Sequence, residues 1–251
     1  MQDVERLKTS FGPKIHPLII DVTDQHSIEL AREQAVKIVG EDSLVAMINN
    51  AGIVVSGAVL YVPMDAWQKQ FEVNILGVIR TMQAFFPLLS KPKVKGDHHP
   101  RRIINMSSVS GLFGSPFLGP YVASKFALEG LTDSLRRELY MHDIQVVLIE
   151  PGSIITPLWQ KAKDNPSYFG EEYASILEFK DRVINQNLET GLPLQAMDKV
   201  IMAAVRKPKV RARYLVRAQK WKFSLIRMLP TKWVDNMVRK KLQEKSGIRP
   251  F

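Results

Sequence analysis

A regular alternation of short apolar runs with amphipathic stretches is the feature that most constrains the fold. The apolar runs predict buried strands at His16–Val22, Leu44–Ile48, Arg102–Met106, Ile144–Ile149 and Val210–Val216. Apolar side chains that recur every three or four residues predict helices from Thr23 or Asp24 to Val39, over Asp65–Leu89 and over Tyr121–Met141. Strands that alternate with helices in this way predict an α/β fold with a doubly wound parallel sheet.

Polar residues and glycines gather where the predicted strands end. These clusters are Asp21, Asn49–Gly52, Ser107–Ser108 and Pro151–Gly152. Open parallel sheets bind their ligands beyond the carboxyl ends of the strands. The clusters therefore predict a ligand site along one edge of the sheet.

Tyr121 and Lys125 are the first candidates for chemistry in this sequence. They lie four residues apart on a predicted helix, so their side chains share one face. A phenol has a pKa of about 10, and a neighbouring ammonium lowers it. Tyr121 could then exchange a proton near neutral pH. A simple surface contact is the alternative explanation of this spacing.

Ser108 and Asn74 could complete such a site. Ser108 follows a predicted strand, and its hydroxyl could bind a substrate oxygen that gains charge. The alternatives are that Ser108 caps a turn, or that Ser107 is the functional serine. Asn74 lies among apolar residues of a helix, where an unsatisfied amide is costly. It either bonds across a helix contact or holds a water or backbone group in a proton path.

Composition excludes several classes of site. The chain has no cysteine, which excludes disulfides, thiolate metal sites and cysteine nucleophiles. Its five histidines show no metal-binding spacing with carboxylates, so we expect no metal. Residues 206–251 hold 15 Lys or Arg against two acids (net +13), and the first 205 hold 20 against 23 (net −3), which gives the total of +10. The charge belongs to the tail, and no recognised nucleic-acid module accompanies it, so nucleic-acid binding is not expected.

Five motifs together resemble the classical short-chain dehydrogenase/reductase family. They are Asn-Asn-Ala-Gly at 49–52, Asn74, Ser108, Tyr121-Val-Ala-Ser-Lys125 and Pro151-Gly152. The resemblance runs from about Ile15 to about Tyr214. The stretch 130–139 and the end of the chain are similar to members that act on retinoids, steroids and other apolar alcohols. The resemblance implies a Rossmann-like fold and an oxidoreductase that transfers hydride between NAD or NADP and an apolar alcohol or ketone.

The resemblance also implies roles for individual residues. Tyr121 would be the general acid/base, Lys125 would lower its pKa and bind the nicotinamide ribose, and Ser108 would orient the carbonyl. Asn74 would hold a water that links Lys125 to solvent. The further cofactor-binding residues would be Asp21 and Val22 at the adenine, Asn49, Ala51 and Gly52 at the adenine-side ribose, and Pro151, Gly152, Ile154 and Thr156 at the nicotinamide.

The sequence departs from the family at its beginning. Members carry a Thr-Gly-x-x-x-Gly-x-Gly turn, and nothing before Asp21 resembles it. We therefore expect an N-terminally truncated sheet without the family's first two strands, and a pyrophosphate without its cradle of backbone amides. Residues 1–10 look like the last turns of a helix that Phe11-Gly12-Pro13 ends, which favours a truncated gene model, a splice form or a fragment of a longer enzyme. The alternative function is a non-catalytic form that cannot bind the dinucleotide. The residue that selects NAD or NADP follows the family's second strand, so both cofactors stay open.

Two regions are expected along the chain. Residues 1–216 would form the incomplete Rossmann-like domain, and residues 217–251 a basic amphipathic tail. Residues 156–197 would close over the substrate, and their aromatic content favours an apolar ligand, with ordinary packing as the alternative. The tail could lie on an anionic membrane or pack on the domain.

The resemblance and the ends of the chain also bear on partners and location. The resemblance implies a homodimer or homotetramer formed through 65–89 and 121–141. No apolar run approaches the roughly 20 residues that span a bilayer, and no signal peptide is apparent. We expect a cytoplasmic or peripherally membrane-associated protein.

Overall fold

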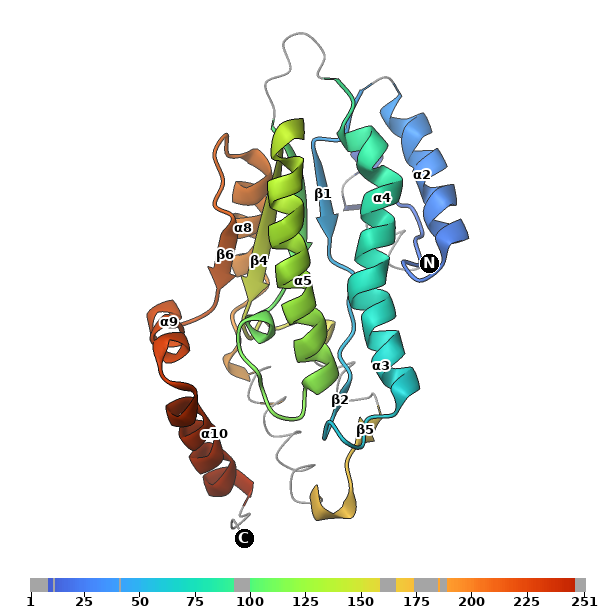
Figure 1. Ribbon diagram of the computed structural model, residues 1–251. Helices are drawn as coiled ribbons and strands as arrows, with labels where there is room; N and C mark the ends of the chain where they lie inside the picture. Colours follow the sequence, from blue (N-terminus) through green and yellow to red (C-terminus); the bar gives the residue numbers. More distant parts are fainter. Residues whose placement is uncertain are drawn as a thin grey trace.

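Four parallel strands form the central sheet of the computed structural model, which describes residues 9–10, 12–40, 42–92, 100–158, 166–173, 185 and 189–246. In sheet order they are β1 (Ala46–Asn49), β3 (Arg101–Met106), β4 (Ile144–Pro151) and β6 (Arg213–Val216). Helices cover both faces of the sheet (Figure 1). The predicted α/β fold with a parallel sheet is confirmed.

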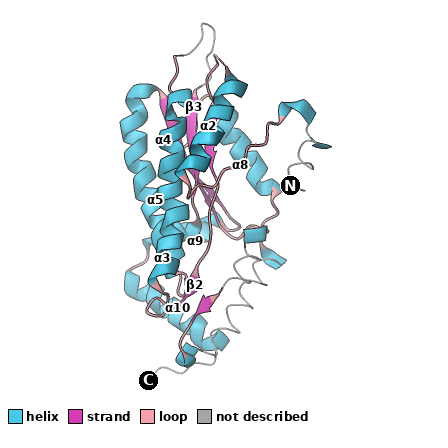
Figure 2. Cartoon of the chain, turned by 90° about the vertical axis from the view of Figure 1, so that its right-hand side faces the viewer, coloured by secondary structure: helices cyan, strands magenta, loops and turns pink. Residues whose placement is uncertain are grey.

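Helices pack on the two faces through two separate cores. On one face lie α2 (Gln25–Val39), α4 (Gly77–Leu89) and α5 (Gly119–Glu138), and on the other lies α8 (Gln195–Arg206) (Figure 2). Successive strand side chains point to opposite faces, so Ile103 joins the first core and Ile104 the second. Both strand faces are therefore apolar, as the continuous apolar runs predicted.

The helix predicted over Asp65–Leu89 consists of three parts. It begins as α3 (Met64–Phe71), passes through a π-helical turn, η2 (Glu72–Leu76), and continues as α4. A π turn bulges the backbone of a helix and occurs frequently at functional sites. Asn74 lies in this turn and is buried. The periodicity of apolar residues did not indicate the turn.

The prediction of a strand over His16–Val22 is wrong. Residues 15–20 carry no regular structure, and Ile19 is 84% exposed. An apolar run becomes a strand only where a neighbour takes up its backbone N–H and C=O groups. Within the described residues, β1 pairs with β3 alone and does not pair with this segment. The segment instead connects to α2, whose N-cap is Asp24, one of the two residues predicted for that position.

Helices α9 (Lys220–Met228) and α10 (Thr231–Ser246) follow β6 and run along one side of the molecule (Figure 1). Among the described residues, no helix combines the length and apolarity that crossing a membrane requires. The predicted helix Tyr121–Met141 ends at Glu138 and continues as a 3-10 turn, η4 (Leu139–His142). Much of the expected substrate lid, 159–165, 174–184 and 186–188, lies outside the described residues.

Arg213 on β6 connects the sheet to helix α5. Its guanidinium forms ion pairs with Glu129, with Asp133 at 2.7 Å and with Glu150 at 3.0 Å. Glu129 and Glu150 are both buried. Burial raises the pKa of Glu150, because desolvation disfavours the carboxylate. Arg213 thus forms an ion pair with each of the two buried carboxylates.

We expect Arg213→Met to destabilise the fold by about 3 kcal/mol at neutral pH, because it leaves buried carboxylates without their cation. Folding raises the pKa of Glu150, so the cost grows as the pH rises above the ordinary carboxyl value and shrinks as the pH falls. Denaturant unfolding at pH 5 and pH 7.5 measures both effects. Arg211→Met, which changes an exposed residue, is the control. A loss that is the same at both pH values would contradict this account.

Candidate active site

The predicted clusters at Asn49–Gly52, Ser108 and Pro151–Gly152 meet at one edge of the sheet. They follow β1, β3 and β4, which are parallel neighbours. The Asn49 side-chain amide donates to Asn105 Oδ1 at 2.7 Å, and Asn105 Nδ2 donates to Thr132 Oγ1 at 2.9 Å. These two buried bonds join the end of β1 to β3 and to helix α5.

Helix α5 brings Tyr121 and Lys125 to this edge. Both side chains are 6% exposed, and Lys125 Nζ lies 5.7 Å from the centroid of the Tyr121 ring. The same Nζ donates to the carbonyl of Met106, at the end of β3, at 2.8 Å. A surface contact is therefore excluded as the explanation of the pair.

Burial dominates the protonation of both groups. It lowers the pKa of Lys125 to about 8, because the ammonium loses its hydration. It raises the pKa of Tyr121, and the hydrogen bond with the Ser108 hydroxyl opposes that rise. The sequence indicated a lowered tyrosine pKa from the neighbouring ammonium. The structure gives the opposite direction, because desolvation of the phenolate is the largest effect.

Ser108, and not Ser107, is the serine that interacts with Tyr121. Its Oγ also accepts a hydrogen bond from Ser110 N at 3.1 Å, at the start of a 3-10 turn, η3 (Val109–Gly111). The two roles considered for Ser108 therefore coexist, since the hydroxyl that caps this turn also bonds with Tyr121 and donates to the Pro151 carbonyl at 3.5 Å. Ser107 Oγ is buried without a hydrogen-bond partner among the described residues.

Asn74 fastens the backbone that follows β1. Its Oδ1 accepts from Ile53 N at 2.9 Å, and its Nδ2 donates to Ile53 O at 3.2 Å and to Ser124 Oγ at 3.1 Å. A Cβ placed on Gly52 would lie 3.5 Å from Asn74 Oδ1 and 4.0 Å from Lys125 Nζ. The helix contact considered for Asn74 is thus present, next to Lys125. Its water-holding role stays a prediction.

Two residues of this network were missed in the sequence. Gln70 is fully buried, accepts from Val55 N at 2.7 Å and donates to Ile53 O at 2.9 Å. Ser124 donates to the Tyr121 carbonyl at 2.8 Å while it accepts from Asn74. Gln70 could have been found, because it is an amide one helical turn before Asn74 on the same face.

The edge fits the nicotinamide-ribose half of a dinucleotide. Lys125 Nζ makes one hydrogen bond within the described residues, so an ammonium there keeps donors for ribose hydroxyls. The absent side chain of Gly52 leaves the space beside that Nζ open. Gly152 serves packing, because a Cβ there would come within 2.8 Å of the Arg217 Cβ.

The remaining predicted cofactor residues have varied surroundings. Ile154 is buried and bridges to Leu192, and Ala51 and Thr156 lie on the connections after β1 and β4. Asp21 is exposed and its carboxylate accepts hydrogen bonds from Thr23, which lowers its pKa. Neighbouring Val22 packs against Gly77 at the start of α4. An adenine-binding role for Asp21 and Val22 stays a prediction.

Aromatic rings form a wall next to the site. Phe117 lies 5.5 Å from Phe169 and 5.8 Å from Tyr173 between ring centroids. Two short strands, β2 (Ser56–Gly57) and β5 (Ser167–Tyr168), hold the segments together, and Tyr61 Oη donates to Glu172 at 2.5 Å. Phe117 has a φ of 63°, a left-handed backbone conformation that is energetically unfavourable for a bulky residue. The residues packed around Phe117 must therefore stabilise this conformation.

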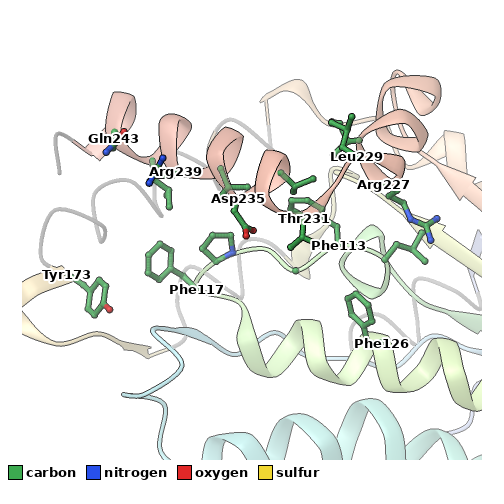
Figure 3. Close-up of a pocket in the computed structure, with 17 residues that line it drawn as sticks. Phe113, Phe117, Phe126, Tyr173, Arg227, Leu229, Thr231, Asp235, Arg239 and Gln243 are labelled. Carbon is green, nitrogen blue, oxygen red and sulfur yellow. The ribbon is translucent and has the colours of Figure 1, made fainter. Parts of the chain in front are cut away.

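A cavity of about 800 Å³ lies between this wall and α10 (Figure 3). Its lining includes Phe113, Phe117, Phe126 and Tyr173 on one side and residues of α10 on the other. Tyr121 and Ser108 are not among its lining residues. The cavity therefore adjoins the segment between Ser108 and Tyr121 from the side of the tail.

We expect Asn74→Ala to destabilise the protein by about 3 kcal/mol, because Ile53 N and O and Ser124 Oγ lose a buried partner. Denaturant unfolding measures the loss. Gln68→Ala, at an exposed position of the same helical segment, is the matched control. Equal stability of the two variants would show that the Asn74 amide does not hold this backbone.

Comparison with known proteins agrees with this geometry. The family model described as short chain dehydrogenase matches residues 2–167. A protein of Ornithobacterium rhinotracheale named NADPH-dependent 3-dehydrocapnine reductase is 33% identical over 97% of this chain and 86% of its own length. A bovine (Bos taurus) protein named 17-beta-hydroxysteroid dehydrogenase type 6 is 32% identical over 68% of this chain and 55% of its own.

The fold also has solved counterparts. A short chain dehydrogenase/reductase from Burkholderia phymatum, solved in complex with NAD, superposes with a TM-score of 0.73 at 20% identity. The match covers 100% of this chain and 84% of that one. With the family model, the relatives and the tyrosine–lysine–serine arrangement in agreement, the chain belongs to the short-chain dehydrogenase/reductase family of NAD(P)-dependent oxidoreductases.

Proposed function

We propose that this protein reduces the ketone of an apolar, lipid-like substrate, with Tyr121, Lys125 and Ser108 as its catalytic residues. The proposal rests on the burial of Tyr121, which contacts both polar and apolar side chains. Lys125 and Ser108 lie on its polar side. Val54, Leu118 and Leu158 pack with its ring on the apolar side. A substrate oxygen that reaches the phenol would therefore be attached to an apolar body.

The proposed chemistry follows from these three side chains. The hydroxyl groups of Ser108 and Tyr121 would hold the carbonyl oxygen and donate hydrogen bonds to it as negative charge develops. Tyr121 would then transfer its proton to that oxygen, and the Lys125 ammonium would stabilise the resulting phenolate. The bound nicotinamide supplies the hydride.

Several apolar substrates fall within this proposal. The relative from Ornithobacterium rhinotracheale is named for 3-dehydrocapnine, and the bovine relative for a hydroxysteroid. The aromatic wall of Phe117, Phe169 and Tyr173 supports an apolar substrate without choosing among lipid ketones, steroids and retinoids. Among these substrate classes we favour lipid-like ketones, because the relative from Ornithobacterium rhinotracheale matches 97% of this chain.

Cofactor titration with a turnover assay tests the proposal. We expect the 251-residue chain to bind NADPH or NADH and to oxidise it when a long-chain 3-ketone is added. Tyr121→Phe should lose about 10³-fold in kcat and keep cofactor binding, because it removes only the proton donor. Tyr140→Phe, at an exposed position, is the control. If the chain binds neither NADPH nor NADH, the alternative function, a non-catalytic form that cannot bind the dinucleotide, would be favoured.

The pH profile of reduction reports on Lys125. Because burial lowers the pKa of Lys125 to about 8, kcat/KM should fall as the pH rises through about 8 and the ammonium loses its proton. In Lys125→Arg the guanidinium stays charged, so the fall should move to higher pH even if the maximum rate drops. Stopped-flow measurement of NADPH oxidation from pH 6 to 10 gives both profiles. A fall at the same pH in both proteins would assign it to another group.

Two partner proposals accompany this function. A homodimer or homotetramer would form through the helical segments 65–89 and 121–141, where Leu76 is an exposed apolar residue of the first segment. An anionic membrane surface would contact helices α9 and α10.

A further inference from the structure

Helices α9 and α10 are a basic region with apolar residues on two opposite faces. Residues 220–246 hold eight Lys or Arg against Asp235 and Glu244, a net of +6. The two helices lie along one side of the molecule, and Leu229 and Pro230 join them (Figure 1). An amphipathic helix that packs on a domain normally has one apolar face. A second apolar face therefore needs an explanation.

The inner face of the two helices faces the body of the molecule across the cavity. Along α10, the residues that line the cavity recur every three or four positions: Thr231, Val234, Asp235, Val238, Arg239, Leu242 and Gln243 (Figure 3). On α9, Phe223 is buried and Ile226 lines the same cavity. Across the cavity, this face lies opposite Phe113 and Phe117.

The opposite face carries five large apolar side chains that are open to solvent. On α9, Trp221, Leu225 and Met228 are spaced i, i+4, i+7, and on α10 Trp233 and Met237 are spaced i, i+4. With 100° per residue, each set lies roughly opposite the cavity-lining residues of its own helix. Their exposed fractions are 63% for Trp221, 54% for Leu225, 81% for Met228, 63% for Trp233 and 50% for Met237. We call these five residues the outer stripe.

Lysines flank the outer stripe. Lys220 and Lys222 lie on either side of Trp221, and Lys222 Nζ lies 5.5 Å from the ring centroid of that tryptophan. On α10, Lys232, Lys240 and Lys241 surround Trp233 and Met237 on the helical surface. Long lysine stems can extend along an apolar surface and place the ammonium in water or among headgroups.

We propose that the outer stripe docks on the surface of an anionic lipid bilayer. Tryptophan, leucine and methionine would enter the boundary between headgroups and acyl chains, and the lysines would contact anionic headgroups. Tryptophan is enriched at that boundary because its ring is apolar and its N–H is polar. The helices would lie in the plane of the surface, with their outer stripe toward the acyl chains.

Charge favours a bilayer over the other possible occupants. A second copy of the chain would place one net +6 region against another, and lysine is depleted at the centres of protein interfaces. A nucleic acid would attract the lysines and leave Leu225, Met228 and Met237 in water. A bilayer of anionic lipid satisfies both the charge and the apolar stripe.

Vesicle co-sedimentation of the full chain tests this proposal. We expect binding to vesicles of phosphatidylglycerol mixed with phosphatidylcholine, weakening with salt, and much less binding to phosphatidylcholine alone. Trp221→Ser with Trp233→Ser should reduce the partition coefficient by about tenfold or more. Lys240→Gln with Lys241→Gln should reduce it by about fivefold per lysine, since each lysine near an anionic surface contributes about that factor.

Two matched controls test whether vesicle binding depends on the outer stripe and its lysines or on any exposed apolar residue or lysine. Tyr140→Ser with Met141→Ser removes apolar residues that are 87% and 82% exposed elsewhere, and Lys37→Gln with Lys69→Gln removes two other exposed lysines. Both controls should bind vesicles like the parent chain, and circular dichroism should show every variant folded. The measurement needs neither cofactor nor substrate, so its result is independent of the proposed reaction.

Three results would overturn the proposal. The first is an absence of vesicle binding at any phosphatidylglycerol fraction. The second is binding that the Trp221 and Trp233 changes leave intact. The third is a chain that does not bind vesicles but forms a dimer, or binds duplex DNA, through the same two tryptophans, as shown by analytical ultracentrifugation or a gel shift of the same variants.

Discussion

The burial of the Lys125 ammonium is the constraint on which the site depends. Its single described hydrogen bond reaches the carbonyl of Met106, so the charge joins helix α5 to the end of β3. A charged group in that position is tolerated only with polar neighbours, and Tyr121 and the backbone supply them. The same burial lowers the lysine pKa toward neutral pH and raises the tyrosine pKa away from it, so the proton stays on Tyr121 until a substrate oxygen can take it. Position and protonation thus have one physical cause.

A second layer of side chains keeps that pair aligned with the sheet. Asn74 and Gln70 form hydrogen bonds with the backbone at 53–55. Ser124 accepts a hydrogen bond from Asn74 and donates one to the Tyr121 carbonyl, so it links the two residues. The π turn places Asn74 among these partners. One helical turn after Lys125 on α5, Arg213 forms ion pairs with the buried carboxylates of Glu129 and, on β4, Glu150. The helix that carries the reactive groups is therefore held by polar contacts at two places along its length, and its apolar stripe packs on the sheet.

Local patterns predicted most of the fold and the centre of the site. Apolar runs located β1, β3, β4 and β6, and strand-end clusters located the functional edge, because both signals depend on nearby residues. The strand at His16–Val22 failed because strand formation depends on a pairing partner that no local pattern reveals. The π turn, the left-handed Phe117 and the serine that interacts with Tyr121 also depend on contacts between distant segments. The direction of the Tyr121 pKa shift was wrong because spacing shows a neighbouring charge but not the loss of solvent.

The most direct test of this account is the pKa of Lys125 in the folded protein. Heteronuclear NMR of lysine side chains, assigned by comparison with Lys125→Met, follows the protonation of its Nζ from pH 6 to 11. The account predicts a midpoint near 8 that moves toward 10.5 on denaturation. A midpoint near 10.5 in the native state would show a solvated ammonium, and it would contradict the buried tyrosine–lysine pair on which the proposed proton transfer rests.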